Sequence, residues 1–344
     1  MIIHYPASAG GVYVYDPDTL IYLGYNENLY YQSRRIALNE LVAGLKADGI
    51  WAKIYQLMIY AAPSSYGYPG NYPDTSQAKT NLKPNPFAYY DAPSQFTPTP
   101  PTYPPPYTPW RGFNMGAGPG LRLLRLELAA LLNYYVVNSN PVLTTPNLLN
   151  NFSFGFWSLT DSQSAGGDIG TVDYYNEYDF VNSVYVPQYP VGWAINARST
   201  TDELRFRVNS EFEYTVPNTN SRGLFIGSRL NSSEMTISRN GVLMSTQAEP
   251  SKSWYQSLSF PGQDLVVGQG GLGGPYCYIG GTWQRPISQL YGSFYNEADL
   301  INSSGREYCL HWLGQGLTPV EQLVLFNRLR DYLLLLIPAA DLGV

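Results

Sequence analysis

The stretch MTISRNGVLMSTQAEP, residues 235–250, constrains the fold of this chain more than any other segment. Asn240 and Gly241 both tolerate the positive φ that a two-residue hairpin turn requires, and the residues on either side favour strands. The predicted cross-strand pairs are Arg239 with Val242, Ile237 with Met244, and Met235 with Thr246. In this register the apolar side chains share one face, which predicts an antiparallel hairpin that is buried on one side only.

Further strand-like segments follow Arg111 at short intervals, and turn residues close each of them. These segments are FSFGFWSLT, VGWAINARS, ELRFRVNS, GLFIGSRL and QDLVVGQ. Many short strands separated in this way are typical of a β-sandwich or jelly roll. The leucine-rich residues 120–137 fit either a helix or strands.

Two helical patterns frame the strands. Apolar residues from Ile36 to Lys46 recur at helical spacing, and Gly49 is expected to end that helix. Near the end of the chain, Thr318, Pro319 and Glu321 form an N-cap, a first-turn proline and a capping-box acid, which predict a closing helix. The Tyr- and Gly-rich opening, residues 1–35, contains strand-like YVYDPDTLIYLGY.

Residues 63–110 form a Pro/Tyr-rich segment that interrupts regular structure. Ten prolines lie between Pro84 and Trp110, and no charged residue occurs from Ala92 to Trp110. One interpretation is a flexible linker, but linkers are usually rich in Gly, Ser or charge. The aromatic residues Phe96, Tyr103, Tyr107 and Trp110 favour an extended assembly arm whose rings bury against this protein or an adjacent subunit.

The composition excludes several classes of function. Only 13% of residues are charged, the net charge is −6, and Lys and Arg form no block, so neither nucleic acid nor an anionic membrane is an expected partner. The opening MIIHYPASAGG lacks the pattern of a signal peptide, and the late apolar run Leu333–Ile337 is too short to span a bilayer. We therefore expect a soluble product without membrane insertion.

Cysteine and histidine are too few for the usual catalytic and metal sites. Cys277 and Cys309 can either form one bridge or remain buried thiols, and the thiols are favoured. His4 and His311 support no catalytic constellation or metal cluster, and His311 beside Trp312 indicates a packed structural residue. Calcium binding through Asp168, Asp173 or Asp179 stays open without a recognisable spacing, so we predict no metal and no cofactor.

Several segments resemble a group of tailed-phage structural proteins. IALNELVAGLKADGIWAKIYQLMIYAAP resembles the helical lead-in of that group, and WRGFNMG its next landmark. The segments that resemble its laminin-G-like, concanavalin A-like sandwich and terminal helix are GLFIGSRLNSSEMTISRNGVLMSTQ, DLVVGQGG and CLHWLGQGLTPVEQLVLFNRLRDYL. The match covers about residues 36–62 and 110–336 in order, and departs from the group at the Pro/Tyr segment and at residues 121–132.

The resemblance implies a mainly β protein with a concanavalin A-like jelly-roll sandwich, an N-terminal helical lead-in and a C-terminal closing helix. We expect three parts: a strand and helix lead-in at 1–62, the extended arm at 63–110, and the sandwich with its terminal helix at 111–344. The resemblance also implies a location on the surface of a phage particle, as a tail fibre, tail-tip adhesin or capsid decoration. The expected partners are other virion proteins and further copies of this chain, with host glycans as candidate ligands.

Glucanases also use the concanavalin A-like sandwich that the resemblance implies, so the sequence must be compared with their catalytic pattern. Such enzymes place two glutamates around an aspartate, and here Glu177 and Asp179 are followed by Asn182 where the second glutamate would stand. An amide cannot exchange the proton that a retaining mechanism needs, so no catalytic residue is predicted. A glycan-active enzyme on the same sandwich and a free lectin remain the alternatives.

The Gly-rich segment GQGGLGGPYCYIGGTWQRP is the candidate binding region. It gathers Tyr276, Tyr278, Trp283 and Arg285, residue types whose rings and planar polar groups recognise sugars when loops present them. Packing of the same rings against the sandwich or a neighbouring subunit is the competing, and favoured, explanation.

Overall fold

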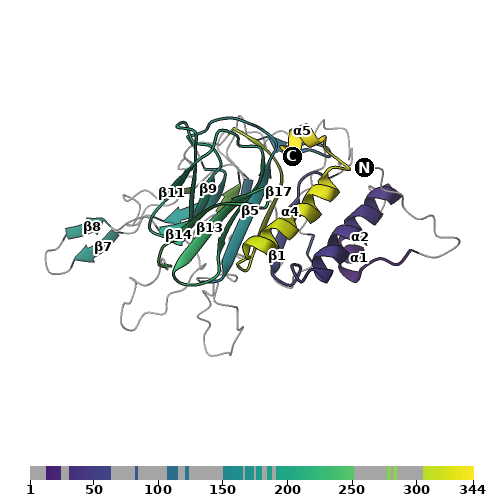
Figure 1. The fold of residues 1–344 in the computed structure, drawn as a ribbon, viewed down its shortest axis with the longest axis horizontal. Helices are drawn as coiled ribbons and strands as arrows, with labels where there is room; N and C mark the ends of the chain where they lie inside the picture. The colour runs from purple at the N-terminus through teal and green to yellow at the C-terminus, as the bar shows by residue number, and fades with distance from the viewer. Residues whose placement is uncertain are drawn as a thin grey trace, which may run out of the picture.

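The computed structural model describes residues 13–24, 31–62, 82–83, 107–114, 121–123, 150–165, 167–173, 176–179, 184–187, 191–251, 277–279, 283–284 and 305–344. Within these residues two mostly antiparallel sheets pack face to face, and helices cover the outer face of one of them (Figure 1). This arrangement confirms the predicted jelly-roll sandwich with a helical lead-in and a closing helix.

The sheet under the helices, here the covered sheet, has the order β14-β13-β12-β5-β17-β3-β2, and β1 also pairs with β17. Its strands are β1 (Ile54–Ile59), β2 (Tyr107–Thr108), β3 (Gly112–Asn114), β5 (Phe152–Ser158), β12 (Gly223–Arg229), β13 (Glu234–Arg239), β14 (Val242–Ala248) and β17 (Glu307–Gly314).

The second sheet, here the open sheet, has the order β11-β10-β9-β6-β15-β4, with β16 pairing in parallel with β6. Its strands are β4 (Leu121–Leu123), β6 (Ile169–Asp173), β9 (Val191–Asn196), β10 (Glu203–Ser210), β11 (Tyr214–Pro217), β15 (Cys277–Ile279) and β16 (Trp283–Gln284). The short pair β7 (Asn176–Asp179) and β8 (Val184–Pro187) projects from the sandwich on the side away from the helices (Figure 1).

Strand β5 shows why the covered sheet is so apolar. All seven of its residues are buried, because Phe152, Phe154 and Phe156 fill the core between the sheets while Trp157 packs under the helices. A strand that is buried on both faces needs no alternation of polar residues. Gly155 lets Trp312 approach closely, since a Cβ at this glycine would lie 2.5 Å from the Trp312 indole nitrogen.

The opening of the chain differs from the prediction. Residues 17–24 form helix α1 (Pro17–Gly24), whereas a strand was expected there. The Asp16 carboxylate accepts a hydrogen bond from the Asp18 N–H at 2.9 Å, and Pro17 occupies the first helical position. An N-cap followed by proline starts a helix, and this local signal outweighs the strand preference of the tyrosines.

The other two predicted helices are confirmed. Helix α2 (Gln32–Ala47) is followed by Gly49 at φ 72°, and α4 (Pro319–Leu333) has the capping box formed by Thr318 and Glu321. Both helices contribute buried leucines to the core above the covered sheet. The short helix α5 (Ala339–Leu342) ends the chain, and the Trp157 indole N–H donates to the Leu342 carbonyl at 3.0 Å. Within the described residues, no helix has the length and apolar character needed to cross a membrane.

The hairpin turn is confirmed, but the register beyond it is wrong. Asn240 and Gly241 have φ of 51° and 74°, and Arg239 pairs with Val242 as predicted. A β-bulge at Met244 then shifts the ladder by one residue, so Ile237 pairs with Ser245 and Met235 with Gln247. Met244 is half-buried and packs against the core between the sheets.

The expectation that only one face of the hairpin is buried is also wrong for β13. Thr236 and Ser238, on its second face, are buried as well. Helix α4 covers them, and Gln322 donates from Nε2 to the Thr236 hydroxyl at 3.3 Å.

The two core residues with reactive side chains are packed in the covered sheet. Cys309 is a free and fully buried thiol, whose pKa burial raises. His311 is fully buried, and its ring nitrogens lie 2.5 Å from the Tyr60 hydroxyl and 3.2 Å from Gln56 Oε1. Loss of solvation lowers the pKa of His311 to about 3, so its ring is neutral and structural.

Candidate functional site

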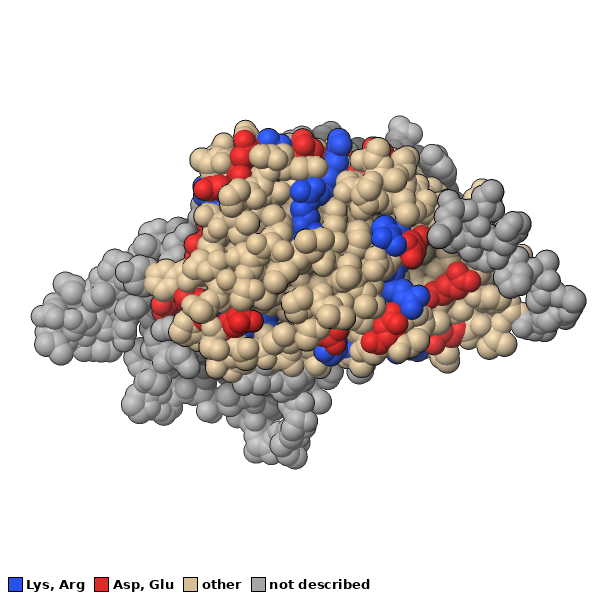
Figure 2. Space-filling view, viewed as in Figure 1, with Lys and Arg blue, Asp and Glu red and all other residues tan. Residues whose placement is uncertain are grey.

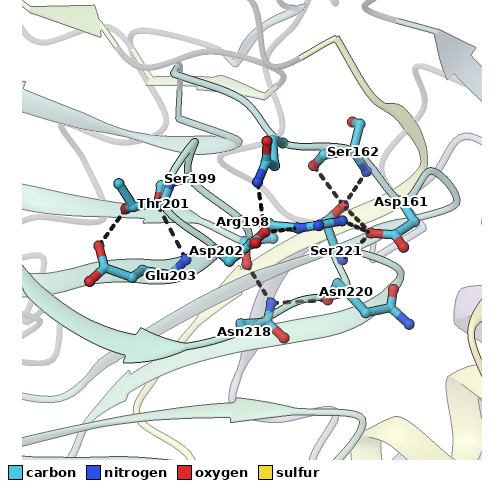
Figure 3. Close-up of polar contacts among 12 residues, drawn as sticks. Asp161, Ser162, Arg198, Ser199, Thr201, Asp202, Glu203, Asn218, Asn220 and Ser221 are labelled. Atoms are coloured by element: carbon cyan, nitrogen blue, oxygen red, sulfur yellow. Dashed lines mark hydrogen bonds and ion pairs between the residues drawn. The ribbon is translucent and has the colours of Figure 1, made fainter.

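Three connections of the sandwich meet at one of its ends. They are residues 159–168 between β5 and β6, residues 197–202 between β9 and β10, and residues 218–222 between β11 and β12. We call them the loop platform. Figure 3 shows that their polar side chains point toward one another and form a continuous set of contacts.

Arg198 lies at the centre of the loop platform. Its Nη1 is 2.8 Å from Asp161 Oδ1 and its Nε is 2.7 Å from Asp202 Oδ1, so one guanidinium joins two of the loops (Figure 3). Gln163 of the first loop adds a second link to the Asp202 carboxylate, because its Nε2 donates to Asp202 Oδ1 at 2.8 Å. The Arg198 side chain is 19% exposed and Asp202 43%, so this group of charges reaches the surface.

Ser221 ties the third loop to the first. Its N–H donates to Asp161 Oδ1 at 3.0 Å, and its hydroxyl donates to the Thr160 carbonyl at 2.9 Å while accepting from the Ser162 N–H. The Asn218 N–H donates to the Asp202 carbonyl at 2.8 Å, which links the second and third loops. Every pair of loops is thus joined directly.

The second loop turns through a left-handed residue. Asp202 has φ of 57°, a conformation that aspartate tolerates better than most residues. The Ser199 hydroxyl accepts from the Thr201 and Glu203 N–H groups at 3.3 Å each, and the Thr201 hydroxyl donates to the Glu203 carboxylate at 2.7 Å. These short-range bonds fix the turn and leave the carboxylates of Asp202 and Glu203 near the surface.

A buried ion pair lies beneath the loop platform. Arg306, which precedes β17, forms a salt bridge with Asp168, and both side chains are 0% exposed. Arg306 also donates from Nη2 to the carbonyls of Ser162 at 2.8 Å and Arg198 at 2.6 Å. Asp168 accepts from the Ala197 N–H at 2.6 Å and from the Tyr308 hydroxyl. One pair therefore holds two of the three loops from below and connects both sheets.

The electrostatics of the loop platform favour ionised groups. Burial alone would raise the pKa of Asp161, but hydrogen bonds from the Ser221 N–H and from Arg198 hold it below its usual range. Hydrogen bonds from Gln163 and Arg198 likewise lower the pKa of Asp202, and Asp202 and Asp161 raise the pKa of Arg198. A carboxylate with a lowered pKa is a poor general acid at neutral pH, and no histidine occurs in these loops.

The arrangement suits hydrogen bonding to a polar ligand better than proton transfer. Carboxylates, an amide, hydroxyls and a guanidinium are presented in fixed positions by a rigid scaffold. The described residues contain no group of three or more His, Cys, Asp or Glu side chains that could hold a metal ion. Asp168, a calcium candidate from the sequence, instead neutralises Arg306.

Two of the four sequence-predicted carbohydrate residues, Tyr278 and Trp283, lie near the loop platform in the backbone register, although their side chains lie outside the described part. Tyr278 pairs with Gly170, and Ile279 pairs with Ile169, directly after Asp168 of the platform. Trp283 pairs with Thr171 at the next position along β6. Tyr276 and Arg285 lie outside the described residues.

The assembly-arm residues are described at one end of the arm. Tyr107 is half-buried, its hydroxyl donates to the Ala62 carbonyl at 2.6 Å, and burial raises its pKa. The Trp110 N–H donates to the same carbonyl at 2.9 Å, and the Arg34 guanidinium lies 5.1 Å from the Trp110 ring centroid. Phe96 and Tyr103 lie outside the described residues, and the assembly role of all four stays a prediction.

These contacts place the two ends of the Pro/Tyr segment side by side. Ala62, the residue before it, contacts Tyr107 and Trp110, so the segment starts and ends at the same place. Between the two ends, Leu82 is buried and donates its N–H to the Leu57 carbonyl at 2.8 Å. The sequence indicated aromatic contact but gave no sign of this closure.

The glucanase-like stretch lies away from the loop platform. Glu177 and Asp179 belong to β7, which pairs only with β8 in the described part of the chain. Asn182 lies outside the described residues.

Sequence reasoning missed the loop platform itself. Its partners are far apart in the chain, with Asp161 60 residues before Ser221 and Asp168 138 residues before Arg306. The one local signal was ARSTTDE, residues 197–203, in which serine, threonine and aspartate follow an arginine in a turn between two strands.

Comparison with known proteins gives a weak likeness of fold. No family model and no curated protein matches the sequence. Among solved structures, a Trypanosoma rangeli sialidase in complex with sialic acid shows 12% identity and a TM-score of 0.37 over 82% of this chain and 34% of its own. The Ruminococcus gnavus IT-sialidase CBM40 shows 10% identity and a TM-score of 0.33 over 63% of this chain and 96% of its own.

A botulinum neurotoxin serotype D/C VPI 5993 binding domain shows 16% identity and a TM-score of 0.26 over 53% of this chain and 37% of its own. The present chain thus spans about a third of the length of the sialidase and neurotoxin chains. Likenesses at these TM-scores carry no information about the site.

Proposed function

We propose that this chain is a non-enzymatic structural protein of a tailed-phage particle, displayed at the particle surface, and that its sandwich binds host glycans. The sequence resemblance supports the virion part of the proposal. The glycan part rests on one observation: the Arg198-bridged carboxylates of Asp161 and Asp202 are held at the surface by the loop platform, whose first loop ends at Asp168, directly before the β6 residues that pair with β15.

The loop platform is exposed, whereas the outer face of the covered sheet is not. Helices bury the outer face of the covered sheet, so that face is closed to a ligand. The loop platform lies at an end of the sandwich, carries exposed polar groups, and adjoins the strand that contains Tyr278. A sugar hydroxyl both donates and accepts hydrogen bonds. In the loop platform the ionised carboxylates can accept from it, the Arg198 guanidinium can donate to it, and the Gln163 amide can do both.

The lowered pKa values of Asp161 and Asp202 favour binding over hydrolysis. A glycosidase needs one carboxyl that can donate a proton, and both of these carboxylates are held in the ionised form by their donors. In this proposal the sandwich holds the loop platform at the particle surface, in a tail fibre, a tail-tip adhesin or a capsid decoration, and the loop platform binds the host glycan.

Two experiments test the proposal. Labelling of the protein on intact particles for electron microscopy should place it at the tail or on the capsid surface, and its absence from particles would overturn the virion assignment. Binding of the purified chain to immobilised host polysaccharide and to sialylated and neutral oligosaccharides tests the glycan part.

The binding variants follow from the contacts. Arg198→Ala removes the bridge and should weaken binding by about tenfold or more, since a hydrogen bond to a charged group contributes roughly 1.5–3 kcal/mol. Arg328→Ala is the matched control, because Arg328 forms a similar surface pair with Asp48, at 2.7 Å, on the helical side. Binding that survives Arg198→Ala, or that Arg328→Ala reduces equally, would place the glycan elsewhere.

A further inference from the structure

Arg222, the last residue of the third loop of the platform, has a guanidinium without a partner. In the described part of the chain this group forms no hydrogen bond and no ion pair, and its Nε is buried. The backbone around it is fixed, because the Arg222 N–H donates to Asn220 Oδ1 at 2.9 Å and a Cβ at Gly343 would lie 2.7 Å from the Arg222 Cβ. A buried donor that lacks an acceptor costs stability, so packing alone does not account for this arginine.

Basic side chains elsewhere in the described residues are mostly paired with acids. Those that form ion pairs are Lys46, Lys53, Arg111, Arg198, Arg205, Arg207, Arg306, Arg328 and Arg330. On the face shown in Figure 2, most blue side chains likewise lie next to a red one. The unpaired Arg222 therefore departs from the pattern that this chain follows at most of its cations.

A second arginine without an acid partner lies against the same loop. Arg239, the last residue of β13, donates from Nε to the Arg222 carbonyl at 3.1 Å and from Nη1 to Asn218 Oδ1 at 3.3 Å. Within the described residues no carboxylate pairs with its half-buried side chain, whose guanidinium lies 5.8 Å from the Phe225 ring centroid. Burial lowers the pKa of Arg239, and the charge of Asp161 only partly opposes this shift.

The charges in this part of the loop platform do not balance. Arg198, Arg222 and Arg239 all act on Asp161, which forms an ion pair with Arg198 alone. Asp202 is the second acid, and it too is paired with Arg198. Three positive charges thus face two negative ones, which leaves one positive charge uncompensated. A bound anion would neutralise it, whereas a neutral sugar would not.

We infer that Arg222 and Arg239 form an anion subsite of the loop platform, which receives the carboxylate, sulfate or phosphate group of an acidic host glycan. The inference rests on the proposed function and narrows its ligand class. A planar guanidinium can donate two parallel hydrogen bonds to the oxygens of such a group. Asn220 offers a further donor in Nδ2, because the Arg222 N–H occupies only its Oδ1. The hydroxyls of the same sugar would then contact the Arg198-bridged carboxylates.

Calorimetric titration of the full chain with matched glycan pairs tests the subsite. Each pair consists of an acidic oligosaccharide and its neutral counterpart, and separate pairs carry sialic acid, a uronic acid, a sulfate or a phosphate. The wild-type chain should bind the acidic member of at least one pair about tenfold or more tightly, and Arg222→Gln should remove this preference while the neutral affinity stays unchanged. Arg328→Gln, on the helical side, is the control and should alter neither affinity.

Two outcomes of this titration would overturn the inference. One is a wild-type chain that binds the neutral member of every pair as tightly as the acidic one. The other is an equal loss of affinity for both members in Arg222→Gln, which would indicate a general effect on the loop and not a contact with the acidic group.

Inorganic sulfate gives a measurement that does not depend on any glycan. Sodium sulfate should raise the thermal midpoint of the wild-type chain and of Arg328→Gln, relative to sodium chloride at equal ionic strength, by more than it raises that of Arg222→Gln. An equal rise in all three proteins would overturn the anion subsite. A larger rise in the wild-type chain without binding of any glycan would instead leave the subsite standing and refute the glycan part of the proposed function.

The stability of the variant itself separates a binding role from a structural one. Arg222→Gln removes an uncompensated charge, so its urea midpoint should equal or exceed that of the wild-type chain. A clearly lower midpoint would show that Arg222 holds the third loop together and would overturn its assignment to the subsite.

Discussion

Removal of the charge beneath the loop platform should be far more damaging than the same change at the surface. Asp168→Asn leaves the guanidinium of Arg306 fully buried without a counter-ion, although the neighbouring carbonyls of Ser162 and Arg198 still accept from it. Breaking a buried pair by neutralising one partner costs about 3–5 kcal/mol of unfolding free energy. The matched change Asp48→Asn disrupts a surface pair, whose side chains are 26% and 42% exposed, and should cost about 1 kcal/mol or less.

Two further variants separate the components of this network. Tyr308→Phe removes one hydrogen bond to the Asp168 carboxylate and should cost roughly 1.5–3 kcal/mol. The double variant Arg306→Met with Asp168→Leu removes both charges, so its cost should be clearly smaller than the sum of the single changes Arg306→Met and Asp168→Leu.

Urea unfolding followed by tryptophan fluorescence is the suitable assay, because Trp157, Trp193 and Trp312 are all fully buried. Amide exchange adds a local measurement. Loss of Arg306 should speed exchange in residues 159–168 and 197–202, the two loops whose carbonyls it holds, before it affects α4. Two results would refute this reasoning. One is an equal loss of unfolding free energy in Asp168→Asn and Asp48→Asn; the other is a loss in the double variant equal to the sum of the losses in the two single variants.

Three further predictions can be checked on the purified chain. Gly241→Ala should destabilise by more than Gly49→Ala, for which about 1 kcal/mol is expected, because both glycines have positive φ but only at Gly241 would the Cβ meet another residue, Leu323 at 2.8 Å; equal urea midpoints would refute the contact. The His311 pKa of about 3 lies below the unfolded value of about 6.5, so stability is fully present above pH 6.5 and falls toward pH 3 by up to about 1.4 kcal/mol per pH unit; His311→Gln should flatten this slope in urea titrations, and an unchanged slope would show that the ring is not buried. The protein should release no reducing ends from β-glucans or host polysaccharide, and steady release that Glu177→Gln abolishes would establish an enzyme.

The sequence by itself determined the features that depend on neighbouring residues. Asn240-Gly241 specified the hairpin turn, because such a turn needs positive φ at its two central residues and both of these residue types tolerate it. Thr318 and Glu321 specified the start of α4, because their capping hydrogen bonds close within one helical turn. The spacing of apolar residues placed α2, and the succession of short strands indicated the sandwich. The start of α1 was also encoded locally, in Asp16 and Pro17, but the tyrosines around it favoured a strand.

Only the tertiary structure decided the features that join distant residues. The bulge at Met244 depends on the core between the sheets, and the burial of Thr236 depends on Gln322 of α4, so neither follows from the hairpin sequence. The loop platform is the clearest case, since Arg306 and Asp168 are 138 residues apart and meet only when the two sheets pack. A buried charge is tolerated only where the fold supplies a partner of opposite charge. No local sequence pattern could therefore reveal the buried Arg306–Asp168 pair beneath the loop platform.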